Sequence, residues 1–159
     1  MHGLPGGGKS TFCLQYSDYL AKNFGNVIYV SGEEGYSKTL KDKVIRTKAD
    51  SRNLYFHDAN NLEEIKQHIP ADRFHFIFID SLDTLRIDAI KLKELREYYA
   101  KSAFITISQS RKDGKMKGDN EILHDADTVI GIHNGIGSTS KNRFNESNRQ
   151  FEVFPNNKV

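Results

Sequence analysis

Hydrophobic positions along the chain follow two patterns, continuous short runs and helical spacings. Continuous runs of β-branched and aromatic residues, typical of buried strands, occupy residues 27–30, 74–79, 103–107 and 127–132. Apolar residues at helical spacing mark residues 12–23, 37–48, 60–69 and 88–101. This alternation predicts an α/β fold with a mostly parallel sheet.

Weaker patterns complete the prediction. Residues 53–56 and 150–154 are short strand candidates, and residues 121–126 favour a helical turn. Residues 135–140 are nearly all glycine, serine and threonine, and this composition predicts a loop.

Composition sets limits on the class of protein. The chain has 159 residues, of which 37% are hydrophobic and 28% charged, and this suits one compact domain over residues 1–159. A net charge of +2 is too small to indicate nucleic-acid binding by itself. A single cysteine, Cys13, excludes an internal disulfide. No segment resembles a signal peptide or a membrane span, so a cytoplasmic protein without membrane contact is expected.

Residues 3–11 read G-L-P-G-G-G-K-S-T and match the P-loop pattern G-x-x-x-x-G-K-[ST]. The glycines allow successive backbone N–H groups to turn toward phosphate oxygens at the start of a helix. The predicted cofactors are therefore ATP and Mg²⁺. The expected phosphate-binding residues are Gly3, Gly6, Gly7, Gly8, Lys9, Ser10 and Thr11.

Two of these residues have more specific expected roles. Lys9 would reach the β- and γ-phosphates, and the Ser10 hydroxyl would bind Mg²⁺. Only Met1 and His2 precede the loop, so the strand that normally holds a P-loop is expected to be missing.

Acidic and amide side chains follow three of the predicted strands. The run at residues 74–79 ends in Asp80, the expected carboxylate of the Mg²⁺ site. Ser81 follows it, so the catalytic base is expected elsewhere, at Glu33 after the strand 27–30, although two adjacent glutamates also suit a solvated turn. Gln109 is either a γ-phosphate contact or an ordinary glutamine at a sheet edge.

The segment 110–120 is polar, punctuated by glycines and basic. Its cations suit contacts with the phosphates of a nucleic acid, whereas aromatic residues for base stacking are absent from it. The candidate DNA-binding residues are Arg111, Lys112, Lys115 and Lys117.

These blocks together resemble the ATPase core of RadA/Sms, a bacterial RecA-superfamily family of DNA repair and recombination ATPases. The resemblance runs from Gly3 to about Phe154 and includes V-S-G-E-E at 30–34, I-D-S-L-D at 79–83, K-D-G at 112–114 and K-N-R-F at 141–144. It implies a RecA-like three-layer α/β/α sandwich and DNA-dependent ATP hydrolysis in repair, recombination or replication.

The resemblance also implies roles for single residues. Glu33 would be the general base, Asp80 would hold the Mg²⁺ shell, and Gln109 would sense the γ-phosphate. Lys141 and Arg143 resemble a K-x-R pair that acts on a neighbouring subunit's site, so a homo-oligomeric ring or filament is implied. Single-stranded or branched DNA is the implied partner.

Several features depart from the family pattern. Asn145 replaces the glycine that ends the K-N-R-F-G signature. The family's N-terminal zinc module and C-terminal Lon-like domain are expected to be absent, so the chain is interpreted as a minimal or truncated version. Two other functions remain open: a nucleotide-binding remnant without turnover, and a small P-loop kinase, for which a lid with arginines and an acceptor pocket are not evident.

Overall fold

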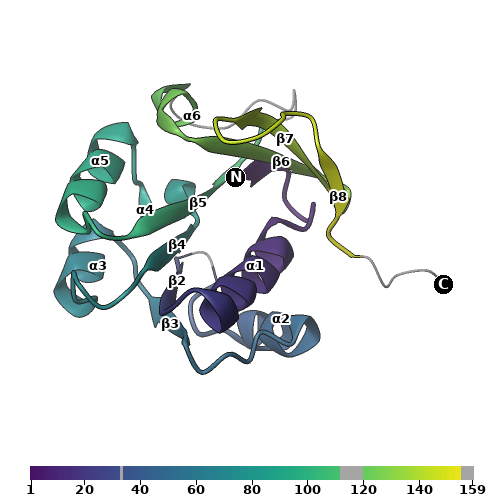
Figure 1. Ribbon diagram of the computed structural model, residues 1–159. Coiled ribbons are helices and arrows are strands. Elements are labelled where there is room, and N and C mark those ends of the chain that lie inside the picture. Colours follow the sequence, from purple (N-terminus) through teal and green to yellow (C-terminus); the bar gives the residue numbers. More distant parts are fainter. Residues whose placement is uncertain (33, 112–119, 155–159) are drawn as a thin grey trace.

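A central sheet lies between two layers of helices in the computed structural model, which describes residues 1–32, 34–111 and 120–154 (Figure 1). The order of strands across the sheet is β3-β2-β4-β5-β1-β6-β7-β8. The strands are β1 (His2–Gly3), β2 (Val27–Ser31), β3 (Leu54–Asp58), β4 (Phe76–Asp80), β5 (Ala103–Gln109), β6 (Thr128–His133), β7 (Ile136–Asn142) and β8 (Gln150–Glu152). Strands β1 to β6 pair in parallel, and β7 and β8 add to the β6 side as antiparallel strands.

The helices divide between the two faces of the sheet. They are α1 (Lys9–Asn23), α2 (Lys38–Thr47), α3 (Leu62–His68), α4 (Leu82–Leu85), α5 (Ala89–Tyr98) and α6 (Asn120–Asp125). One core cluster joins α1 and α2 to the sheet through residues such as Leu14 and Leu40. The other joins α3, α4 and α5 through residues such as Ile65 and Leu95. The three-layer α/β/α arrangement predicted from the sequence is therefore confirmed.

Side-chain caps fix where four of these helices begin. In each case a serine, asparagine or aspartate accepts a hydrogen bond from the backbone N–H three residues later, which satisfies a donor that the first helical turn leaves open. The caps are Ser37 for α2, Asn61 for α3, Ser81 for α4 and Asp88 for α5.

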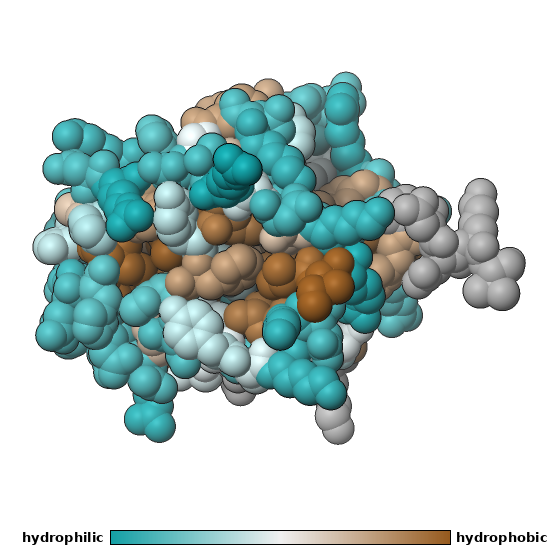
Figure 2. Space-filling model, turned by 90° about the horizontal axis from the view of Figure 1, so that it is seen from below, coloured by the Kyte–Doolittle hydropathy of each residue, from teal (hydrophilic) through white to brown (hydrophobic). Residues whose placement is uncertain are grey.

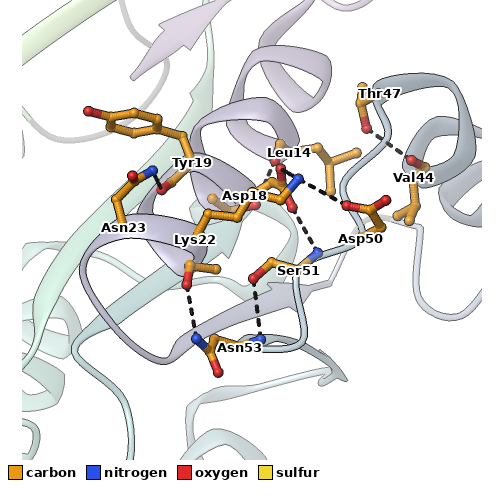
Figure 3. A network of polar contacts seen from close by, with 12 residues as sticks. Leu14, Asp18, Tyr19, Lys22, Asn23, Val44, Thr47, Asp50, Ser51 and Asn53 are labelled. Atoms are coloured by element: carbon orange, nitrogen blue, oxygen red, sulfur yellow. Dashed lines mark hydrogen bonds and ion pairs between the residues drawn. The ribbon is translucent and has the colours of Figure 1, made fainter.

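A polar network ties α1 to the segment between α2 and β3 (Figure 3). Asp18 accepts a hydrogen bond from the Ser51 backbone N–H at 2.9 Å and forms an ion pair with Lys22 at 2.7 Å. Lys22 also reaches Asp50, and the Asn53 side chain donates to the Ala21 carbonyl. Since α1 begins at the end of the P-loop, these contacts hold that helix against the sheet.

The strand before the P-loop, expected to be missing, is present as the two-residue strand β1. His2 pairs with Ser108 of β5 on one side and with Gly131 of β6 on the other. The backbone N–H groups of Ser108 and Ser110 donate to the carbonyls of Met1 and Gly3. A strand this short is held because both of its edges are paired inside the sheet.

Residues 135–140 were predicted as a loop, and that prediction was wrong. They lie largely in β7, which pairs with β6 on one side and β8 on the other. Gly137 lies under the ring of Phe151, where a Cβ atom would come within 2.2 Å of the ring. The small residues therefore make room for an aromatic side chain of the next strand.

The molecular surface is mixed in character. Seen from below the view of Figure 1, hydrophobic side chains gather in a band across the middle of the face, with hydrophilic ones around it (Figure 2). No helix among the described residues has the length and apolar character needed to cross a bilayer.

Candidate functional site

The P-loop backbone curls in the way its glycines permit. Gly6 and Gly8 have φ angles of 76° and 101°, in the region that side chains disfavour. Gly7 closes a turn by donating its N–H to the Leu4 carbonyl at 3.1 Å. Gly3 and Gly7 also pass close to β6, since a Cβ atom would lie 2.2 Å and 3.2 Å from the Ile132 oxygen. Glycine is therefore required here for both conformation and space.

The loop leads directly into α1, whose first turn has no side-chain cap. Gly8 is the N-cap residue and offers no capping oxygen, so backbone N–H groups at this helix start are available to an anion. Lys9 is 8% exposed and donates to the Leu4 carbonyl at 2.9 Å. Ser10 is half-buried, and Thr11 is buried in the same turn.

Asp80 ends β4 at the same edge of the sheet as the P-loop. The carboxylate is 5% exposed, and its Oδ2 accepts a hydrogen bond from the Tyr29 hydroxyl at 2.6 Å. Its Oδ1 is buried and has no hydrogen-bond partner among the residues that the structure describes. An unpaired buried carboxylate oxygen is costly, so it marks a position suited to a cation.

Burial is the main reason that the pKa of Asp80 is raised above its ordinary value. Hydrogen bonds from Tyr29 and Ser10 oppose this rise, as does the charge of Lys43, whereas the charge of Glu34 adds to it. The Ser10 hydroxyl therefore lies at the Asp80 carboxylate, as the expected Mg²⁺ site requires. Burial and the neighbouring Asp80 also raise the pKa of Tyr29 well above its ordinary value.

Of the two glutamates after β2, the structure describes Glu34. It forms an ion pair with Lys43 of α2, and its Oε2 is buried without a hydrogen-bond partner among the described residues. Its charge acts on Asp80, so the segment after β2 does border the Asp80 site. Glu33, the expected general base, lies outside the described residues and stays a prediction.

Gln109 is placed beside the P-loop by strand pairing. It is the register partner of Gly3 across β5 and β1, and its backbone N–H donates to Asp83 Oδ2 at 2.8 Å. Arg111 is exposed two residues later. The other candidate DNA-binding residues, Lys112, Lys115 and Lys117, lie outside the described residues.

Lys141 and Arg143 lie away from this edge of the sheet. Both are near the end of β7 that pairs with the start of β6, whereas the P-loop adjoins the end of β6. Lys141 donates to the carbonyls of Leu123 and His124 at the end of α6. Arg143 forms an ion pair with Asp127 at 2.9 Å, with both side chains about half exposed. The structure does not bring this pair together with the P-loop of the same chain.

The residues present fit a Mg²⁺ ion. Hydroxyl and carboxylate oxygens are the ligands that Mg²⁺ prefers, and it is usually held by one or two protein groups together with substrate phosphates. Ser10 and the unpaired Oδ1 of Asp80 supply such groups next to the P-loop. The described residues contain no cluster of three or more histidine, cysteine or acidic side chains that would hold a metal independently of a ligand.

Sequence reasoning missed two contributors to this site, Tyr29 and Lys43. Tyr29 was taken only as part of a hydrophobic strand, although a tyrosine among fully buried residues needs a partner for its hydroxyl. Lys43 was assigned to a solvated basic face of α2. Its ion pair with Glu34 depends on how α2 packs, which periodicity alone does not give.

Sequence comparison finds relatives named DNA repair protein RadA. The chain is 33% identical to that of Helicobacter pylori over 80% of its length, and 30% identical to that of Listeria monocytogenes over 92%. It is 35% identical to that of Aquifex aeolicus over 80%. These matches cover 32–36% of the relatives, so the chain spans about a third of their length. No family model matches the chain.

Structural comparison finds the same fold in two solved structures. One, described as an ATPase domain, superposes with a TM-score of 0.68 at 14% identity, over 94% of this chain and 78% of the other. The flagellar accessory protein FlaH from Methanocaldococcus jannaschii gives a TM-score of 0.65 at 15% identity, over 95% and 82%. At such low identity these matches define the fold, which is RecA-like.

Proposed function

Since this chain is a RecA-like domain homologous to about a third of the length of the RadA DNA repair proteins, we propose that it binds ATP with Mg²⁺ and hydrolyses it. The observation that carries the proposal is the uncapped P-loop helix facing a buried carboxylate with an unpaired oxygen. We treat residues 1–159 as a single domain of this type.

Each residue of the site has a defined task in this proposal. The N–H groups of the P-loop and the Lys9 ammonium bind the β- and γ-phosphates. Ser10 and Asp80 hold the metal ion, which when bound withdraws charge from the phosphate oxygens. Glu33, which follows β2 in the sequence, accepts the proton of the attacking water, and Gln109 hydrogen-bonds the γ-phosphate from β5.

Lys141 and Arg143 act on the site of a neighbouring copy. Their position at the opposite end of β6 from the P-loop supports this role, because it keeps them from the site of their own chain. Two cations supplied in this way would stabilise the charge that develops on the transferred phosphoryl group. Hydrolysis is then expected to depend on assembly into a ring or filament.

DNA is the proposed partner, and the protein is proposed to act in repair, recombination or replication. Relatives named as DNA repair proteins support this. Arg111 supports it as well, because it is exposed just after β5 at the edge where the P-loop lies. Phosphate contacts of this kind respond to charge and not to base sequence.

The proposal is tested by binding of a fluorescent ATP analogue and by ATP hydrolysis, each over a range of protein concentrations and with or without single-stranded DNA. Lys9→Ala is the control, because it removes a charged donor to the phosphates, and such a bond is worth about 1.5–3 kcal/mol. We expect about a tenfold or larger loss of affinity in this variant. Turnover by the unaltered protein should rise with protein concentration and with DNA.

Two results would contradict the proposal in different ways. Failure of the unaltered protein to bind the analogue would reject the nucleotide site. Binding without turnover at every protein and DNA concentration would favour a nucleotide-binding remnant. Phosphoryl transfer to a small acceptor in place of water would favour the kinase alternative.

A further inference from the structure

Tyr29 lies in the middle of β2, one of the most deeply buried strands of the sheet. Its side chain is 0% exposed, and its ring stacks on Phe78 of β4 with centroids 5.8 Å apart and planes 14° apart. Phe56 of β3 contacts it from the other side at 5.8 Å. The ring is therefore held on both sides, and its hydroxyl has little freedom to move.

Strand register directs this hydroxyl to Asp80. Tyr29 is the partner of Phe78, and Ser31 is the partner of Asp80, so Tyr29 and Asp80 are diagonal neighbours on one face of adjacent strands. Diagonal neighbours are within reach of an aromatic side chain. The hydroxyl donates to Asp80 Oδ2 at 2.6 Å, a short bond of the strength expected for a carboxylate acceptor.

The bond engages one oxygen of the carboxylate and leaves the other for a ligand. Asp80 Oδ1 is buried and has no hydrogen-bond partner among the described residues. The backbone of Asp80 is held too, since its carbonyl accepts the Gly32 N–H at 2.7 Å. Without the phenol, rotation about the last side-chain bond of Asp80 would exchange the two oxygens.

We propose that Tyr29 is a positioning residue that holds Asp80 with its Oδ1 turned toward the divalent cation of the nucleotide site. This inference rests on the proposed function. Groups that orient a metal ligand from behind typically change metal affinity about 10- to 100-fold when removed. Tyr29 acts on the metal only through Asp80, so its removal should affect metal binding and spare metal-independent contacts of the nucleotide.

The experiment compares Tyr29→Phe with Tyr99→Phe. Tyr29→Phe keeps the stacked ring and removes only the hydroxyl, so folding is expected and is checked by circular dichroism. Tyr99 is a matched control, because it is 1% exposed and its hydroxyl also makes buried hydrogen bonds, to the carbonyls of Ile65 and Ile69. These lie in the core on the other face of the sheet.

Two readouts besides turnover are used. Binding of a fluorescent ATP analogue is titrated with Mg²⁺ and repeated in EDTA, and binding of Mn²⁺ in the presence of the nucleotide is followed by electron paramagnetic resonance. For Tyr29→Phe we expect the half-saturating Mg²⁺ concentration to rise about tenfold, with unchanged affinity in EDTA. Tyr99→Phe should lower thermal stability and leave both metal titrations unchanged.

The outcomes separate this inference from the proposed function. An unchanged Mg²⁺ midpoint in Tyr29→Phe, with a metal-dependent unaltered protein, would overturn the positioning role alone. An equal shift in both variants would overturn it as well, because the effect would then come from general loss of stability. If the unaltered protein bound no nucleotide, the proposed function and this inference would fall together.

Discussion

Asp80 combines deep burial with an unpaired oxygen, and this combination has a consequence for stability. Its pKa is raised above the ordinary value of 3.8, mainly by burial, so the folded state holds the proton more tightly than the unfolded state. The contribution of this group to stability is therefore full below the ordinary pKa and decreases as the pH rises through the raised pKa.

The prediction is that Asp80→Asn stabilises the nucleotide-free protein at pH 7, because the amide carries no charge to bury. A gain of about 1 kcal/mol in the free energy of unfolding would raise the melting temperature by roughly 2–4 °C. Thermal unfolding between pH 4 and 8 measures this, and the gain should shrink toward pH 4. A variant less stable than the unaltered protein at pH 7, without nucleotide and Mg²⁺, would contradict it.

The same measurement gives a second comparison within the variant. Mg²⁺ with a non-hydrolysable ATP analogue should raise the melting temperature of the unaltered protein, since a ligand that binds only the folded state stabilises it. The variant should show a much smaller rise, because it lacks the carboxylate for the metal. Asp80 would thus reduce stability in the free protein in exchange for metal affinity.

At the residue scale, the sequence was informative wherever chemistry is set by local spacing. The P-loop and the acid at the end of a buried strand are read directly from neighbouring letters. The partners of Asp80 were not, because Tyr29 lies 51 positions away and reaches it only through the pairing of β2 with β4. Long-range register of this kind is not encoded in any short stretch of sequence.

At the element scale, β1 depends on the absence of a side chain at Gly3. A Cβ atom there would lie 2.2 Å from the Ile132 oxygen, a backbone atom that cannot move without disturbing β6. We predict that Gly3→Ala separates β1 from β6 and lowers the free energy of unfolding by about 1–3 kcal/mol or more. Because the P-loop starts at this residue, nucleotide affinity should fall as well.

A matched control for Gly3→Ala is Gly131→Ala, on β6 beside β1. Here a Cβ atom would meet the His2 ring at 3.7 Å, an ordinary contact. Thermal unfolding and nucleotide binding of both variants, measured side by side, test the claim. Equal melting temperatures for the two variants would show that the close approach at Gly3 does not hold β1 in the sheet.

At this scale the alternation of strands and helices was predictable, and two strands were not recognised. A two-residue strand has no periodicity, so β1 is visible only from the partners on both sides of it. Strand β7 contains Gly137, Ser138 and Thr139, whose composition favours a loop. Its pairing with β6 and β8, with Phe151 over Gly137, outweighs that local preference.

At the scale of the whole molecule, the Lys141 and Arg143 pair is engaged within its own chain. Lys141 binds the carbonyls at the end of α6, and Arg143 binds Asp127, which follows α6. An exposed ion pair of this kind is worth about 0.2–1 kcal/mol, so a neighbouring phosphate site can displace Asp127 readily. We therefore expect the Arg143 guanidinium to exchange partners when copies assemble.

This leads to a prediction for Arg143→Ala. An arginine supplied to a phosphoryl-transfer site contributes about 10³-fold or more to turnover, so hydrolysis at high protein concentration should fall by that order. Binding of a fluorescent ATP analogue by dilute protein should be unchanged. Asp127→Asn is the matched control, since it removes the ion pair and keeps the arginine, and its turnover should stay within about fivefold of the unaltered protein.

Mixing two inactive variants tests whether Arg143 acts between chains. Lys9→Ala subunits keep Arg143 but lose the phosphate contact, and Arg143→Ala subunits keep the phosphate contact but lack the arginine. If Arg143 of one subunit serves the P-loop of its neighbour, mixed assemblies contain some complete sites, and ATP hydrolysis should recover in part. Equimolar mixtures that remain as inactive as either variant, although both bind each other, would show that the arginine does not act across the interface.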